Sequence, residues 1–253
     1  MSPGNALSLG VPSPSLTIRP VSPSTPASPA PSDAPSPDAA SPDAPAAVDA
    51  VLFDLLTALL DSWTVWNRAA KSDEDGRRWR HRYLELTYAA GNYRPYEALV
   101  HESARSAGLG NDAAARLLAS WDTLEAWPEV PSVLAALAPT VRLGVVTNCS
   151  NALAARAVAR LGHPVDVWVA AERAGAYKPD ARPYALALAD LGLPASRVLF
   201  VAGSPFDIPG AGGVGMRVVW HNRLQLARPA GVGLPWRETA TLDTLPALVR
   251  RVG

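Results

Sequence analysis

Short apolar runs alternate with longer amphipathic stretches along most of the chain. The runs cover residues 50–53, 143–146, 165–170, 198–201 and 217–220. Between the last four, residues 150–161, 182–191 and 205–214 carry apolar side chains at the spacing of a helix face. Strands that alternate with helices in this way indicate parallel βαβ units. The pattern therefore predicts an α/β protein with a Rossmann-like parallel sheet core.

The first apolar run is separated from the second by about 90 residues, more than one crossover helix needs. Within this gap, residues 63–70, 76–90, 94–107 and 112–125 have apolar side chains at three- and four-residue spacing, which predicts four helices. We expect a helical cap domain over residues 62–126, inserted after the first strand. The core would then consist of residues 48–61 and 127–253. A cap in this place can contact substrate and exclude water.

Residues 1–47 have a different composition from the rest. They contain about half of the chain's 25 prolines and no aromatic residue. Such a segment buries too little apolar surface to offset its ordering entropy, so we expect a disordered tail. It has no basic start followed by an apolar core, and so does not resemble a signal peptide. A wrongly assigned start is the alternative explanation for it.

The overall composition favours a cytoplasmic protein that acts on a small molecule. The 23 basic and 23 acidic residues balance, which argues against a nucleic acid or a membrane surface as partner. The single cysteine, Cys149, excludes an intrachain disulfide framework, and no run of 18 apolar residues predicts a membrane span. A homodimer is left open.

Polar residues follow several of the predicted strands. Asp54 ends the first run, Thr147 and Asn148 follow the second, and Lys178 and Asp207 come later. In an open α/β sheet the carboxyl ends of the strands share one crevice, so we expect these side chains to meet there. A carboxylate near an amine, a hydroxyl, an amide and a second carboxylate is typical of a nucleophilic aspartate with charge-stabilising partners.

The order of these motifs, with the insertion after the first, resembles the haloacid dehalogenase superfamily over nearly all of residues 49–253. The first motif is Asp54-Leu55-Leu56-Thr57-Ala58. Phosphatases of the superfamily have Asp-x-Asp-Gly-Thr there, and L-2-haloacid dehalogenases have Asp-x-Tyr-Gly-Thr. The resemblance implies that Asp54 forms a covalent ester which water then hydrolyses, with Lys178 and Asp207 as the other catalytic residues.

Two positions argue against phosphatase chemistry. Leu56 replaces the acid that would protonate a leaving alcohol, and general acid catalysis contributes about 10²- to 10⁴-fold. Gly203 stands where a metal-binding carboxylate is expected, and glycine has no side-chain oxygen for a hard cation. We therefore expect neither a metal nor another cofactor.

The segment around Arg80 favours the metal-independent L-2-haloacid dehalogenase branch. Its sequence is Trp79-Arg80-His81-Arg82-Tyr83-Leu84-Glu85-Leu86-Thr87, which matches that branch's Trp-Arg-x-x-x-Leu-Glu-x-Thr. A halide leaves as a stable anion without being protonated. The resemblance implies that Arg80 holds the departing halide or the substrate carboxylate. It also implies four further substrate-binding residues, namely Thr147, Asn148, Ser204 and Tyr184.

Less specific interpretations stay open beside this one. Asp54 could cap the segment that follows it, Arg80 could belong to a water-facing basic stretch, and Tyr184 could be a core residue. The chain also departs from the family at Ala58 and Ala202. For the protein as a whole, the alternatives are a Mg²⁺-dependent phosphatase of the same superfamily and a non-catalytic binder of small molecules.

Overall fold

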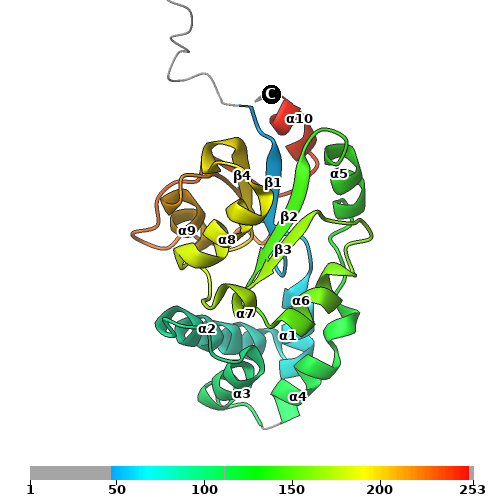
Figure 1. Cartoon of the computed structure of the whole chain (residues 1–253). Coiled ribbons are helices and arrows are strands. Elements are labelled where there is room, and N and C mark those ends of the chain that lie inside the picture. Colours follow the sequence, from blue (N-terminus) through cyan, green and yellow to red (C-terminus); the bar gives the residue numbers. More distant parts are fainter. Residues whose placement is uncertain (1–46, 111, 251–253) are drawn as a thin grey trace, which may run out of the picture. The chain divides into compact units, whose positions relative to one another are not determined.

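A six-stranded, all-parallel sheet forms the centre of the structure, a computed structural model that describes residues 47–110 and 112–250 (Figure 1). Apart from Ala47, the predicted tail lies outside these residues. The strand order is β3-β2-β1-β4-β5-β6. The strands are β1 (Ala50–Asp54), β2 (Arg142–Thr147), β3 (Val167–Ala170), β4 (Val198–Ala202), β5 (Arg217–His221) and β6 (Arg237–Thr239). The predicted fold class is confirmed.

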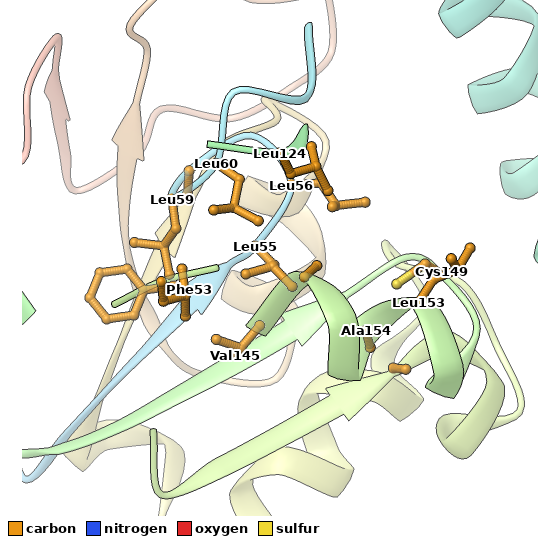
Figure 2. Close-up of a cluster of buried hydrophobic side chains, with 14 of the residues drawn as sticks. Phe53, Leu55, Leu56, Leu59, Leu60, Leu124, Val145, Cys149, Leu153 and Ala154 are labelled. Carbon is orange, nitrogen blue, oxygen red and sulfur yellow. The ribbon is translucent and has the colours of Figure 1, made fainter. Parts of the chain in front are cut away.

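Both faces of β1 are covered, which explains its unbroken apolar sequence. Val51 and Phe53 belong to one buried cluster, whereas Ala50 and Leu52 belong to the other. The first face lies under α5 (Val130–Leu137), α6 (Asn151–Val158) and α10 (Leu245–Arg250), and the second under α8 (Ala181–Leu191) and α9 (Asp207–Gly213) (Figure 1). Figure 2 shows Phe53, Val145 and Leu153 of α6 among the side chains of the first cluster. Because β1 lies between β2 and β4, the strand order reverses at its carboxyl end, where open sheets bind their ligands.

Four helices and a 3₁₀ turn precede α5 in the long segment between β1 and β2. They are α1 (Ser62–Ala70), α2 (Asp73–Ala89), α3 (Tyr96–Ser106), α4 (Asp112–Ala119) and the turn Trp121–Thr123. Asp61 caps α1 by accepting a hydrogen bond from the Thr64 N–H (3.1 Å), and Ser72 caps α2. Aromatic contacts hold the helices together. The ring of Trp66 on α1 packs against that of Trp79 on α2, with 4.7 Å between their centroids. Figure 1 shows these helices beyond the carboxyl ends of the strands.

The chain leaves the sheet and returns to it at neighbouring points. Leu60 and Ala126 form an isolated antiparallel bridge. The Asp61 N–H donates to the Glu125 carbonyl (2.8 Å), and the Trp127 N–H donates to the Leu59 carbonyl (3.0 Å). The four-helix segment is thus closed at its base by backbone hydrogen bonds.

The structure differs from the predicted elements in several places. The helix predicted over residues 112–125 ends at Ala119, where the Ser120 hydroxyl donates to the Arg116 carbonyl (2.8 Å) and a 3₁₀ turn follows. The pattern did not predict α5, α10, the four-residue α7 (Ala171–Ala174) or β6. The last is only three residues long and mostly exposed, so it has no apolar alternation to detect. No described helix is long and apolar enough to cross a membrane.

Candidate active site

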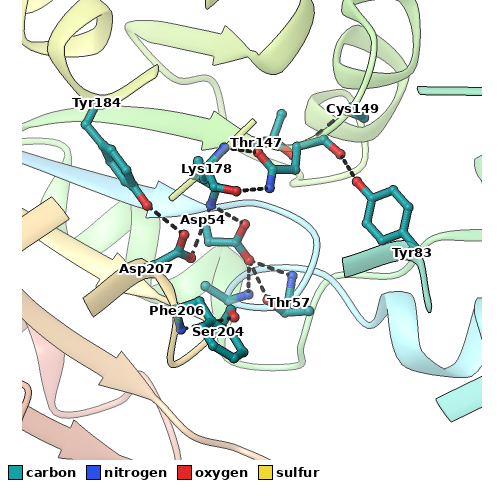
Figure 3. A network of polar contacts seen from close by, with 12 residues as sticks. Asp54, Thr57, Tyr83, Thr147, Cys149, Lys178, Tyr184, Ser204, Phe206 and Asp207 are labelled. Carbon is teal, nitrogen blue, oxygen red and sulfur yellow. Dashed lines mark hydrogen bonds and ion pairs between the residues drawn. The ribbon is translucent and has the colours of Figure 1, made fainter. Parts of the chain in front are cut away.

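Asp54 lies at the carboxyl end of β1, and the turn after it folds back onto its side chain (Figure 3). Its Oδ2 atom accepts hydrogen bonds from the Thr57 N–H (2.9 Å), the Ala58 N–H (3.2 Å) and the Thr57 hydroxyl (2.5 Å). Its Oδ1 atom accepts one from Lys178 Nζ (2.7 Å). The two oxygens therefore differ: one has three donors from the following turn, and the other has the lysine.

Lys178 lies between two carboxylates. Its Nζ is 2.7 Å from Asp54 Oδ1 and 3.2 Å from Asp207 Oδ2, and its side chain is only 3% exposed. Asn148 fixes its backbone, because the Asn148 amide donates to the Lys178 carbonyl (3.0 Å) and accepts from the Lys178 N–H (2.7 Å). Burial alone would lower the pKa of Lys178, but the charges of Asp207 and Asp54 raise it above its ordinary value. The amine thus stays protonated.

The two carboxyl groups titrate in opposite directions. Burial alone would raise the pKa of Asp54, but the charge of Lys178 and the hydrogen bonds from Lys178 and Thr57 lower it below its ordinary value. Burial raises the pKa of Asp207, and the attraction of Lys178 does not outweigh burial and the nearby charge of Asp54. Asp54 is therefore the stronger acid of the two.

Tyr184, on α8, contacts the second carboxylate, Asp207. Its hydroxyl donates to Asp207 Oδ1 (2.8 Å), and its ring packs against Phe200 at 5.2 Å between centroids. Burial raises the pKa of Tyr184 well above its ordinary value, so the hydroxyl keeps its proton and acts as a donor. Tyr184 is thus both a core residue and a partner of Asp207.

A small cavity of about 50 Å³ opens between the strand ends and the helical insertion. Arg80 of α2 borders it, with its guanidinium donating to the Ser62 hydroxyl (3.1 Å) and lying 4.2 Å from the centroid of the Trp63 ring. Burial lowers the pKa of Arg80 and the charge of Asp54 opposes this, but a guanidinium remains cationic at any working pH. The full lining is Asp54, Leu56, Thr57, Arg80, Tyr83, Leu84, Tyr88, Asn148, Lys178, Ser204 and Asp207.

The structure brings together six of the eight residues predicted for the site. Thr147 and Tyr184 do not line the cavity. Thr147 is fully buried and its hydroxyl lies 3.8 Å from the sulfur of Cys149, while Tyr184 reaches the site only through Asp207. Ser204 lines the cavity, and its hydroxyl accepts a long hydrogen bond from the Phe206 N–H (3.4 Å).

Several lining residues were not predicted from the sequence. Tyr83 joins the insertion to the sheet, because its hydroxyl donates to the Asn148 carbonyl (2.9 Å). Tyr88 and Leu84 extend the wall on the same helix. All three follow Arg80 on α2 at three- to four-residue spacing, so the helical period from Arg80 was a usable signal. Thr57 lies inside the first motif, one position before the threonine that the family pattern expects.

Gly203 allows the turn after β1 to approach β4 closely. A Cβ atom at this position would lie 2.2 Å from the Thr57 hydroxyl oxygen and 2.4 Å from the Ala58 nitrogen. Two further side chains contact the carbonyl oxygens of the same turn. The Trp127 indole N–H donates to the Thr57 carbonyl (3.2 Å), and His221 Nδ1 lies 2.9 Å from the Ala58 carbonyl. The two peptide groups that bind Asp54 are therefore held on both sides.

These residues do not fit the Mg²⁺ ion that phosphatases of the superfamily use. The lysine amine already bridges Asp54 and Asp207. Gly203 supplies no oxygen ligand, and the contacts of its missing Cβ show that a carboxylate side chain could not be placed there without moving the turn. Over residues 47–110 and 112–250, no three His, Cys, Asp or Glu side chains are grouped as metal ligands.

Comparison with known proteins assigns the family. A family model described as haloacid dehalogenase-like hydrolase matches residues 48–215, and the chain therefore belongs to this family of hydrolases. It is 28% identical over 222 residues to (S)-2-haloacid dehalogenase 1 of Pseudomonas sp. (strain CBS-3), covering 81% of this chain and 98% of that protein. It is 30% identical over 195 residues to the (S)-2-haloacid dehalogenase of Pseudomonas sp. (strain YL), covering 70% and 83%. A crystal structure of an L-2-haloacid dehalogenase superposes with a TM-score of 0.73 at 26% identity, covering 81% of this chain and 99% of that one.

Proposed function

We propose that the protein hydrolyses the carbon–halogen bond of 2-haloacids without a metal ion, through a covalent ester on Asp54. The observation that carries this proposal is the difference between the two Asp54 oxygens: Oδ2 accepts three hydrogen bonds from the following turn, and Oδ1 accepts one from the Lys178 amine. The names of the related dehalogenases support the choice of substrate class.

In the first step Asp54 acts as the nucleophile. Oδ1 attacks carbon 2 of the acid, the new carbon–oxygen bond forms, and the halide leaves with the electron pair of the broken bond. Oδ1 is the better candidate, because Oδ2 already accepts three hydrogen bonds. Arg80 borders the cavity and supplies a permanent positive charge for the departing halide or the substrate carboxylate.

In the second step water attacks the ester carbon, Cγ of Asp54. Oδ2 is then the carbonyl oxygen on which negative charge develops, and the two N–H groups and the Thr57 hydroxyl are preorganised to stabilise it. Asp207 takes the proton of the water, a role that suits its raised pKa. The bond between Cγ and Oδ1 then breaks, and the leaving alkoxide takes the proton from Asp207. The products are a 2-hydroxy acid and free Asp54.

The helical insertion serves as a cap in this scheme. Through Arg80, Tyr83, Leu84 and Tyr88 it forms one wall of the cavity, and the Tyr83 bond to Asn148 ties that wall to the sheet. Because the cavity is small, a closed cap would exclude bulk water and strengthen the electrostatic contacts inside. We place this reaction in the cytoplasm, on the basis of the single cysteine. A homodimer stays a prediction.

Measuring chloride release from both enantiomers of 2-chloropropanoate, with and without excess EDTA, tests the proposal. We expect turnover of the (S) enantiomer, unchanged by EDTA. Phosphate release from p-nitrophenyl phosphate in Mg²⁺ serves as the parallel assay. If EDTA abolishes turnover and Mg²⁺ restores it, or if only phosphate is released, the phosphatase alternative replaces the proposal. Binding of 2-chloropropanoate without turnover in either assay would support the alternative of a non-catalytic binder.

A further inference from the structure

A second, larger cavity lies directly outside the catalytic one. Its volume is about 480 Å³, compared with about 50 Å³ for the inner cavity, and Arg80 and Leu84 line both. We propose that this outer cavity binds the alkyl chain of the substrate, so that the protein prefers 2-haloalkanoic acids with chains longer than propanoate. The inference rests on the proposed function, because it takes the reacting carbon to lie beside Asp54.

The outer cavity has the lining that an alkyl chain requires. Trp63 of α1 and Leu84 of α2 form its wall on the insertion, and Leu224 and Leu226 form the wall on the segment after β5. Leu224 is 45% exposed, one of two large apolar side chains with high exposure among residues 47–110 and 112–250. The other three lining residues are Arg77, Arg80 and His81, all on α2. A concave surface that combines apolar side chains with a few polar ones is typical of a ligand site.

The same apolar wall continues inward to the catalytic turn. Trp63, Leu224 and Leu226 also border a gap of about 10 Å³, which Thr57 and Gly203 line as well. This gap is too small for a chain but shows that the wall extends to the turn that binds Asp54. The outer cavity therefore meets the catalytic cavity at Arg80 and Leu84. Through Trp63, Leu224 and Leu226 it also adjoins the gap beside the catalytic turn.

Arg80 places a positive charge at the boundary between the two cavities. Its guanidinium lies 4.2 Å from the Trp63 ring centroid and 3.1 Å from the Ser62 hydroxyl, so the positive group is held at the boundary. Carbon 2 of a 2-haloacid carries a carboxylate, a halogen and the alkyl chain. The carboxylate and the halogen would lie in the inner cavity, where Arg80 and Lys178 supply positive charge. The apolar chain would extend past Leu84 into the larger outer cavity.

Burial of the chain should give a regular increase in affinity with length. A fully buried methylene contributes about 0.8 kcal/mol, which is about a fourfold decrease in Kd. A partly open cavity buries each methylene incompletely, so we expect about two- to fourfold for each one. Unreactive straight-chain acids measure this effect without any dependence on turnover.

Calorimetric titration of the full-length protein with propanoate, hexanoate and octanoate tests the inference. In the wild type we expect Kd to decrease with each added methylene. Leu224→Gln and, separately, Leu226→Gln place a polar amide in the apolar wall and should make the three Kd values converge. Leu234→Gln is the matched control, since Leu234 is 81% exposed and lines neither cavity; it should keep the wild-type dependence.

The outcomes separate this inference from the proposed function. Equal Kd values for the three acids in the wild type, no binding of any of them, or an unchanged chain-length dependence in both Gln variants would each overturn the outer site. Measuring kcat/KM for chloride release from 2-chloropropanoate and 2-chlorohexanoate completes the test. Chain-dependent binding with no chloride release would contradict only the dehalogenase function, and release without chain dependence would contradict only the outer site.

Discussion

The carboxyl ends of β1 and β4 each present a buried aspartate to the same lysine, yet the two surroundings differ. Asp54, after β1, accepts three hydrogen bonds from its own turn and one from Lys178, and its pKa is lowered. Asp207, after β4, has one bond from Lys178 and one from Tyr184, and its pKa is raised. Environments that separate the pKa values of two acids in one site divide their roles. In the proposed mechanism, this difference assigns Asp54 the role of nucleophile and Asp207 the role of proton acceptor.

Removing the charge of Asp54 should have the largest effect. Asp54→Asn keeps the size of the side chain but removes the attacking anion, so we expect kcat to fall by at least about 10⁴-fold, the scale typical of a lost nucleophile. Steady-state chloride release measures it. Asp190→Asn is the matched control, because Asp190 pairs with Arg173 away from the site and the substitution should leave kcat unchanged. Residual activity above one tenth in Asp54→Asn would remove it as the nucleophile.

The same change at Asp207 should act on the second step instead. Without a proton acceptor for the attacking water, Asp207→Asn should lower kcat by about 10²- to 10⁴-fold, as for loss of a general base. The ester on Asp54 should still form and should accumulate. Intact-protein mass spectrometry after mixing with substrate detects the added mass of the ester-linked acid. A variant that neither accumulates an ester nor turns over would show that Asp207 is needed for the attack itself.

A side chain at Gly203 should damage the turn that binds Asp54 Oδ2. In Gly203→Ala the new Cβ would lie 2.2 Å from the Thr57 hydroxyl and 2.4 Å from the Ala58 nitrogen, so the turn must move. We expect kcat to fall by about 10²- to 10³-fold, since donors to the developing charge are displaced. Gly212→Ala is the control, because the Cβ added there would meet nothing within 4 Å. Thermal midpoints of both variants separate misplacement from unfolding, and full activity of Gly203→Ala would contradict the role of the turn.

Removing the Tyr184 hydroxyl should have the smallest effect of these substitutions. It should shift the pH dependence of kcat more than it lowers the maximal kcat. The hydroxyl lowers the pKa of Asp207, so Tyr184→Phe should raise that pKa further. Asp207 must be ionised to accept a proton, and activity is therefore lost as pH falls through its pKa. The acid limb of kcat should move to higher pH in Tyr184→Phe, with little change in the plateau at high pH. Tyr177→Phe, which loses a bond to the Arg94 carbonyl, should leave the limb in place.

Much of this arrangement could be predicted from the sequence. The parallel sheet followed from apolar runs, and Asp54, Lys178 and Asp207 were expected together because strand ends converge at one edge. Thr147 was also expected there, but side chains alternate along a strand. Val145 belongs to the cluster under α6, and Thr147, two residues later, points the same way, toward Cys149.

Other features depend on distances that no local pattern contains. The close approach of Gly203 to the turn at Thr57 joins residues about 146 positions apart, and only the packed sheet shows that a glycine is needed there. Thr57 thus donates to Asp54 one position earlier than the family pattern suggests. The outer cavity escaped prediction for a similar reason, since Leu224 and Leu226 come from a segment without helix or strand.

A single turnover in ¹⁸O-labelled water tests the central claim most directly. With enzyme in excess over (S)-2-chloropropanoate, water attacks Cγ of the ester, so one labelled oxygen should remain on Asp54 and the product hydroxyl should carry none. Peptide mass spectrometry should find a mass increase of about 2 Da confined to the peptide that contains Asp54, as expected for covalent catalysis by this carboxylate. Label in the product hydroxyl, with Asp54 unlabelled, would mean direct attack of water on the substrate and would contradict the covalent mechanism.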